Sequence, residues 1–231
     1  MRARVRLGVL LAGLGQILIL LWLSWYWTEQ GAPAPRRHAV ADFGSVIVSP
    51  DVRYTVNWVL ASGDNASMDF VVIDKRSAHL YVLNEVGRLR GSTPVLLGAA
   101  FGDISPPGIG LVAIADVKPA QRVTPAGRFL AERGHNLRGE DVVWLDYEAA
   151  LSIHRVVSSN AQERRLERLN SHSSEDNRIS YGCINVEPQF YEDYIRPIFS
   201  SRRAMIYVLP ETINVQSLFY SHTEVQVVQR N

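Results

Sequence analysis

The sequence predicts a mainly β domain with a few helices, preceded by one N-terminal transmembrane helix. A run of 21 residues near the N-terminus carries no charged side chain. Short apolar segments beyond residue 69 are bounded by turn residues, and several alternate with a period of two, as strands do. Beyond the first 35 positions, about 196 residues remain, which is enough for one domain with a hydrophobic core.

The uncharged run extends from Leu7 to Trp27. As a helix it would span about 30 Å, the hydrocarbon thickness of a bilayer. No basic residue follows it until Arg36, whereas three precede it: Arg2, Arg4 and Arg6. This asymmetry predicts a cytoplasmic N-terminus and an external domain. The alternative is a cleaved signal peptide ending at Ala34, although Pro35 would then follow the cut.

Composition and periodicity divide the chain into five expected parts. These are a basic tip and transmembrane anchor (1–28), a polar, proline-rich linker (29–48), a leading helix and loop (49–68), a sheet-dominated domain (69–210) and a C-terminal tail without a clear period (211–231). Basic and acidic residues nearly balance, with 24 Lys and Arg against 23 Asp and Glu. This balance does not suggest a nucleic-acid partner.

The leading helix has a clear start and stop. Ser49 is a preferred cap, Pro50 suits the first turn, and Asp51 lies near the positive end of the helix dipole. Gly63 could end the helix. One face is apolar, with Val52, Val56, Val59 and Leu60.

The rest of the domain is predicted to be mostly strands. The expected strands are 69–74, 79–84, 92–98, 123–132 (after a proline-containing turn), 141–147, 151–157 and 204–210. Residues 101–110 form a loop with two prolines and three glycines. The polar run 158–178 has room for a short exposed helix at 161–169, and 187–201 reads as an amphipathic helix opened by Glu187 and Pro188.

Cys183, in the stretch RISYGCINV, is the only cysteine of the chain. Thiols outside the cytoplasm tend to be oxidised, yet one cysteine cannot form an internal disulfide. Cys183 is therefore a buried inert thiol, an intermolecular linker or a nucleophile. Gly182 before it permits a sharp turn, and nearby backbone amides could form an oxyanion hole.

A thiolate nucleophile needs a base, and histidine is the usual one. Among six histidines, His154 lies on the predicted strand 151–157, where a rigid element would hold it in place. His172 in the polar run is the competing candidate. The ordinary alternative for His154 is a side chain on the exposed face of a strand.

The segment from His154 to Asn185 resembles the signature of the L,D-transpeptidase (YkuD-like) catalytic domain. That signature is a histidine, a spacer, then Ser/Thr-His-Gly-Cys, a hydrophobic residue and Asn or Arg. Here the second part reads Ser180-Tyr181-Gly182-Cys183-Ile184-Asn185. VVIDKRSAHLYVLN (71–84) is similar to the family's opening strand pair, and TPAGRF (124–129) to its Thr-Pro-x-Gly-x-Phe turn. The resemblance covers about 69–210 and implies a β-sandwich-type catalytic domain.

Two departures from the family pattern stand out. The spacer from 155 to 179 has 25 residues, more than is usual in the family. The excess falls in the polar run 158–178, where a surface insertion is tolerated. Tyr181 stands where the family has a histidine, which puts the substrate preference in doubt. Tyrosine can still donate a hydrogen bond.

The resemblance implies acyl transfer through a thioester on peptidoglycan stem peptides. Cys183 would be the nucleophile and His154 its base, with Gly182, Tyr181, Ser180 and Asn185 shaping the oxyanion site and the loop. Arg178 and Arg155 are weaker candidates for binding the substrate. The implied location is the cell inner membrane, single-pass, with the catalytic domain in the periplasm, or the periplasm itself after signal cleavage.

Three alternative functions remain open from the sequence. Water as acceptor would give an L,D-carboxypeptidase, and a degenerate site would leave a membrane-tethered peptidoglycan-binding protein. A papain-like protease is disfavoured because the histidine precedes the cysteine. We expect no cofactor and no metal, because one cysteine and dispersed histidines lack ligand spacing.

Overall fold

The computed structural model describes residues 40–200 and 202–218. One mixed sheet dominates them, with strand order β3-β2-β1-β10-β5-β6-β7-β9. Its strands are β1 (Phe70–Asp74), β2 (His79–Leu83), β3 (Leu89–Pro94), β5 (Gly127–His135), β6 (Asp141–Asp146), β7 (Leu151–Arg155), β9 (Ile184–Val186) and β10 (Ala204–Leu209). A small parallel sheet pairs β4 (Leu97–Gly98) with β8 (Arg178–Ser180). The mainly β architecture is therefore confirmed.

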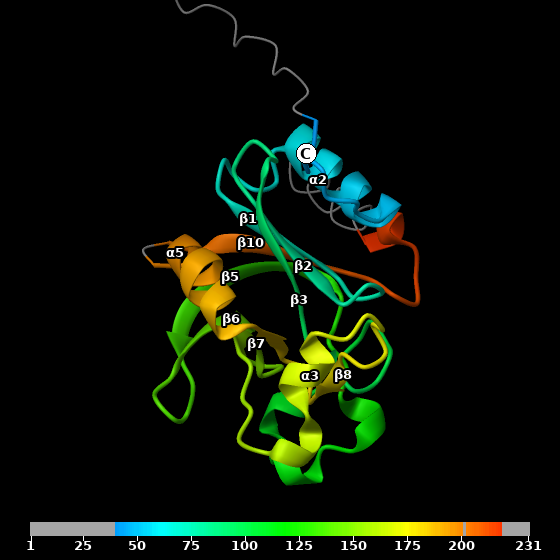
Figure 1. The fold of residues 1–231 in the computed structure, drawn as a ribbon, viewed down its shortest axis with the longest axis vertical. Helices are drawn as coiled ribbons and strands as arrows, with labels where there is room; N and C mark the ends of the chain where they lie inside the picture. Colours follow the sequence, from blue (N-terminus) through cyan, green and yellow to red (C-terminus); the bar gives the residue numbers. More distant parts are fainter. Residues whose placement is uncertain (1–39, 201, 219–231) are drawn as a thin grey trace, which may run out of the picture. The chain divides into compact units, whose positions relative to one another are not determined.

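Helices cover both faces of the large sheet. The predicted leading helix is present as α2 (Pro50–Ser62), with Ser49 as its N-cap and Gly63 in the left-handed conformation at its end. A second helical stretch, predicted at 187–201, consists of α4 (Pro188–Phe190), the π-helical η5 (Tyr191–Ile195) and α5 (Arg196–Ile198). Figure 1 shows α2 at one end of the domain and α3 with β8 at the other.

The remaining helical segments are short. Of three 3-10 turns, η1 (Ile109–Leu111) begins within the predicted loop 101–110, and η2 (Ile114–Asp116) and η3 (Pro119–Gln121) follow it. The polar run contains η4 (Ala161–Glu163) and α3 (Arg165–Leu169). The helix predicted at 161–169 is thus two shorter pieces, separated by Arg164 in the left-handed conformation.

Side chains of the central strands β1 and β10 point alternately to the two faces of the sheet, and this divides the core into two layers. In β1, Val71 and Ile73 belong to the cluster that contains α5, while Phe70 and Val72 pack in the cluster that contains α2. Parallel pairing with β10 extends both layers, because β10 alternates in the same way. Strands buried on both faces read as continuous apolar runs, which is why 69–74 and 204–210 are so hydrophobic.

The domain extends beyond the limits expected from the sequence. Ala41 and Phe43 are buried beside α2, so the part of the expected linker from 41 onward belongs to the core. The leading helix packs in the same cluster and is no separate element. The expected tail contributes Val215 to the core and Glu211 to a buried charge cluster.

That charge cluster joins four distant segments. Lys75 Nζ, fully buried, donates to Asp103 Oδ1 at 2.7 Å and to Thr124 O at 2.9 Å. Glu211 lies 3.6 Å from the same Nζ and pairs with Arg178. Because Arg178 opens β8, which leads into the Cys183 loop, this cluster fixes the base of that loop.

Within residues 40–200 and 202–218, no helix has the length and apolar character needed to cross a bilayer. The predicted anchor at 7–27 lies outside the described residues.

Candidate active site

Parallel pairing of β7 with β9 brings the predicted site residues together. His154 is the direct partner of Asn185 in this register. Side chains alternate between sheet faces, so Ser152 and Cys183, two positions earlier on each side, lie over the same face. Ile153 and Ile184 point to the opposite face and are fully buried. The result is a cluster of four polar side chains on one face of two adjacent strands.

The loop that carries Cys183 is held by backbone contacts. Gly182 has φ +133°, and a Cβ there would lie 2.9 Å from Val123 O, so a side chain at this position would clash. Thr124 Oγ1, fully buried, donates to Gly182 O at 2.7 Å and accepts from Gly98 N at 2.8 Å. The Thr-Pro turn therefore supports the nucleophile loop, a structural role.

Ser180 closes the same loop from within. Its Oγ donates to Cys183 O at 2.6 Å and accepts from Gly182 N at 3.1 Å. The Gly182 amide thus bonds within the loop, and its part in an oxyanion site stays a prediction. The amide of Cys183 has no hydrogen-bond partner among the described residues, so it is available as a donor.

The Cys183 sulfur is half-buried and lies in a polar environment. Sγ lies 3.2 Å from Ala150 O and 3.5 Å from Ser152 Oγ. Burial alone would raise the pKa of the thiol, but a hydrogen bond and charge attraction with His154, helped by Ser152, lower it below the ordinary value. The site therefore favours the thiolate, which is the reactive form of cysteine.

Hydrogen bonds define the tautomer of His154. Nδ1 lies 2.8 Å from Arg155 O, a pure acceptor, so Nδ1 must carry a hydrogen. In the neutral ring, Nε2 is then left with a lone pair. Burial alone would lower the pKa of the imidazole, whereas the hydrogen bond and attraction to Cys183 raise it above its ordinary value. His154 is therefore equipped to take the thiol proton.

The two arginines proposed as substrate contacts do not join this cluster. Arg178 is buried, donates to Lys75 O at 2.8 Å and pairs with Glu211. Arg155 points to the other face, where it pairs with Asp141 at 3.0 Å and stacks on Tyr191. The charge of each is already compensated within the domain, and a substrate contact by either arginine stays a prediction.

Tyr181 is partly exposed next to the nucleophile, and its ring supports a cation. The Arg122 guanidinium carbon lies 4.1 Å from the ring centroid, within the range of a cation–π contact. Arg122 also donates to Val117 O at 3.2 Å and forms no ion pair within the described residues. Tyr181, in place of the family's histidine, thus positions a positive charge beside the Cys183 loop.

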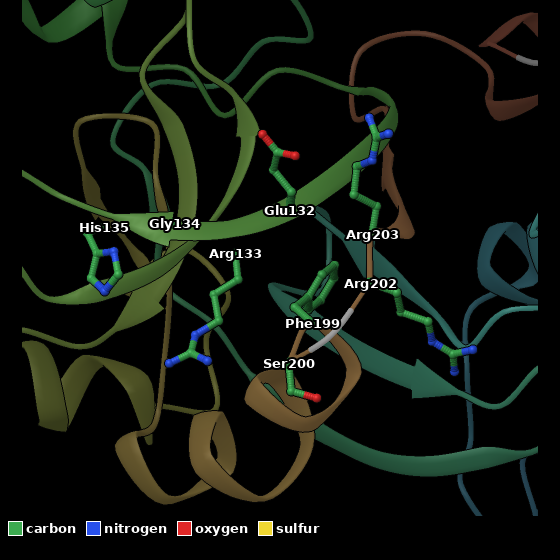
Figure 2. Close-up of a pocket in the computed structure, with 8 residues that line it drawn as sticks. All are labelled: Glu132, Arg133, Gly134, His135, Phe199, Ser200, Arg202 and Arg203. Atoms are coloured by element: carbon green, nitrogen blue, oxygen red, sulfur yellow. The ribbon is translucent and has the colours of Figure 1, made fainter.

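Two hollows of the domain lie away from Cys183. One of about 580 Å³ is lined by Glu132, Arg133, Gly134, His135, Phe199, Ser200, Arg202 and Arg203. Figure 2 shows that its three guanidinium groups point in different directions and do not converge on one point. A second, of about 470 Å³, contains His79 and His172. His172 therefore lies in a different environment from Cys183.

Two residues of the site escaped the sequence reasoning. Ser152 could have been found, because its position two residues before His154 puts it on the same strand face. Arg165 could not: it lies in the polar run, and nothing in the pattern shows that its guanidinium reaches Asn185 at 2.7 Å.

No protein-family model matches the sequence, and no curated protein matches it. Among solved structures, the cell-shape-determining protein Pgp2 of Campylobacter jejuni is 17% identical, with 63% of this chain and 49% of that chain covered and a TM-score of 0.42. L,D-transpeptidase 1 of Mycobacterium tuberculosis is 16% identical, with 61% of each chain covered and a TM-score of 0.35.

The catalytic domain of an L,D-transpeptidase from E. faecium is 16% identical, with 62% of this chain and 98% of that domain covered and a TM-score of 0.34. The chain thus spans about half the length of the Campylobacter protein and under two thirds of the Mycobacterium protein. Transpeptidases of the family that the Cys183 loop resembles recur among these matches. The similarity is too low to carry their reaction or residue roles over to this chain.

Proposed function

We propose that the domain is a cysteine acyltransferase that acts on peptidoglycan stem peptides, with Cys183 as nucleophile and His154 as base. The observation that supports this most is that half-buried Cys183 interacts with His154 through a hydrogen bond and charge attraction, which lower the pKa of the thiol. His154 lies on β7, and Cys183 lies directly before the adjacent parallel strand β9, in a loop that Ser180 and Thr124 hold in place.

In the proposed reaction, the Cys183 proton passes to His154 Nε2 and the sulfur attacks a substrate carbonyl carbon. The Cys183 amide stabilises the oxyanion that forms. The C–N bond to the terminal D-amino acid then breaks, and His154 returns its proton to the leaving amine. An acceptor amine attacks the thioester, forms a new amide bond and releases the thiolate, with His154 taking the amine proton.

The substrate and location are inferred from the family resemblance of the sequence. A stem peptide with an amine-bearing third residue supplies both the donor carbonyl and an acceptor amine. Such substrates lie outside the cytoplasm, which suits the predicted external domain and its attachment to the inner membrane. Arg122 on the Tyr181 ring adds a cation where a substrate carboxylate could bind.

Mass spectrometry of muropeptides incubated with the full chain tests the proposal. Transfer predicts loss of the terminal D-amino acid and a new cross-linked or exchanged product. Loss of that residue without a new amide bond would identify an L,D-carboxypeptidase. Unchanged muropeptides, together with retention of the chain on insoluble wall, would replace the enzyme with a tethered wall-binding protein.

Replacing His154 with alanine is expected to reduce D-amino-acid exchange by about 10²–10⁴-fold, because a positioned base contributes that much to proton transfer. His172→Ala is the matched control and should stay within about two-fold of the parent, since His172 lines a separate hollow. Initial rates of exchange measured on both variants decide between the two histidines. Equal losses, or a larger loss from His172→Ala, would reassign the base.

A further inference from the structure

The polar run 158–178 places one cation against the candidate site. Its helix α3 is anchored by Leu169, which is buried with Leu96 and Val156. Arg165 lies four residues earlier and so on the same face of this one-turn helix. Its side chain is only 11% exposed and pairs with Glu163. The insertion therefore delivers a fixed guanidinium to the site.

That guanidinium contacts Asn185, a fully buried residue with three polar partners. Arg165 Nη1 donates to Asn185 Oδ1 at 2.7 Å. Asn185 Nδ2 lies 3.1 Å from His154 Nε2 and 3.4 Å from Cys183 O. Arginine can only donate and a carbonyl can only accept. Arg165 and Cys183 O therefore both fix the same orientation of the Asn185 side chain, with its N–H toward His154.

We propose that Arg165 is a positioning residue for His154: it fixes the side-chain amide of Asn185 so that an N–H faces the Nε2 lone pair. This inference rests on the proposed function, in which His154 is the base. Asn185 then holds the imidazole in position and favours its neutral form, the form that can accept the thiol proton. Its N–H leaves the Nε2 lone pair as that proton arrives. The long spacer between the histidine and the cysteine thus has a role at the site.

The surroundings of the imidazole limit which groups can influence its protonation. Cys183 faces it from the loop before β9, and Arg165 faces it from α3. Glu163 of η4 pairs with Arg165, and the Arg155 guanidinium points to the other sheet face. Removing Arg165 would take away a positive charge and free the Asn185 amide to turn its oxygen toward Nε2. Both changes favour the imidazolium.

The test measures the ring pKa of His154 by NMR in the full chain carrying Cys183→Ala, which removes the coupled thiol titration. Adding Arg165→Met should raise this pKa by about one unit, as expected for a nearby charge and a lost donor. Arg164→Met is the matched control: it removes the neighbouring arginine, which is 68% exposed and paired with Glu167. It should leave the His154 pKa within about 0.2 units.

A third comparison separates the effect that Arg165 exerts through Asn185, the relay, from direct charge repulsion between Arg165 and the His154 imidazolium. With Asn185→Ala already present, Arg165→Met should shift the pKa by less than half as much, because the intermediary is gone. A full-sized shift in that background, or no rise after Arg165→Met alone, would overturn the proposal. Should Arg165→Met not fold, Arg165→Gln offers the same comparison with a shorter, uncharged polar side chain.

The NMR measurement does not depend on wall chemistry. A relay that behaves as expected in a chain that leaves muropeptides unchanged would refute the proposed function and leave the role of Arg165 intact. Muropeptide transfer without the pKa shift would refute the relay alone.

Discussion

Replacing Cys183 with alanine should reduce the release of the terminal D-amino acid by at least about a thousand-fold, because it removes the nucleophile of the proposed acyl intermediate. Ser152 lies 3.5 Å from the sulfur but has no base contact of its own among the described residues. The rate is measured by mass spectrometry of stem tetrapeptides over time. Persistent exchange in this variant would exclude a thioester at Cys183.

The fold should survive this change, which keeps the test interpretable. The side chain is small and half-buried, and the loop around it is held by Ser180 and Thr124 rather than by the sulfur. We expect the free energy of unfolding to change by about 1 kcal/mol or less. A denaturant titration of the parent and the variant measures this. A collapse of stability would show that the thiol is a core group.

The pH dependence of thiol alkylation in the parent chain is an independent test of the lowered pKa of Cys183. Since the pKa of Cys183 is lowered, the thiolate is present at lower pH than for an ordinary cysteine. Alkylation should therefore reach half its maximal rate below about pH 8.5, the value for an unperturbed thiol. Adding His154→Ala should move this midpoint upward.

Replacing Lys75 with methionine should destabilise the domain by about 3–5 kcal/mol, as expected when one partner of a buried ion cluster is removed. Burial holds the pKa of Lys75 below its ordinary value despite its acidic neighbours, so the charged lysine is itself costly. We base the expectation on Asp103 and Glu211, which would remain buried without it. The free energy of unfolding in denaturant measures the effect.

Lys118→Met is the matched control, because that lysine is exposed and forms no ion pair in the part of the chain that the structure describes. It should change the unfolding free energy by about 0.5 kcal/mol or less. Glu211→Gln offers a milder change to the same cluster if Lys75→Met cannot be purified. Equal stability of the Lys75 and Lys118 variants would show that the cluster contributes nothing net.

The cluster also predicts how stability falls in acid. Burial alone would raise the pKa of Asp103, but hydrogen bonds from Lys75, Thr212 and two backbone amides hold it well below its usual range. A carboxyl whose pKa is lower in the folded protein stabilises the fold at any pH above its pKa in the unfolded chain, which is about 4. This contribution is lost as the pH falls further. Stability should therefore decline below about pH 4, less steeply in Lys75→Met.

Local patterns predicted most of the elements, because each depends on neighbouring residues. The caps of α2, the apolar run of β1 and the alternation of β7 are all encoded within about a dozen positions. The proximity of His154 to Asn185 has a different origin. It follows from the parallel pairing of β7 and β9, and such a pairing is not visible in either strand alone.

Side chains that act over long sequence distances were the hardest to predict. Lys75 follows an apolar strand and reads as a turn residue, yet it is fully buried against partners far along the chain. Glu211 lies in a segment without any period. For Arg165, composition indicates only a solvated polar run. In each case the partner is set by topology, which a single sequence does not display.

The pairing of β7 with β9 also makes the acidity of the thiol a property of the native state. In an unfolded chain Cys183 would have neither His154 nor Ser152 beside it and would behave as an ordinary cysteine. At a pH below about 8.5, the ordinary pKa of a cysteine thiol, a thiol reagent should therefore label native molecules faster than unfolded ones. The lone cysteine thus provides a chemical count of correctly folded protein, without any substrate.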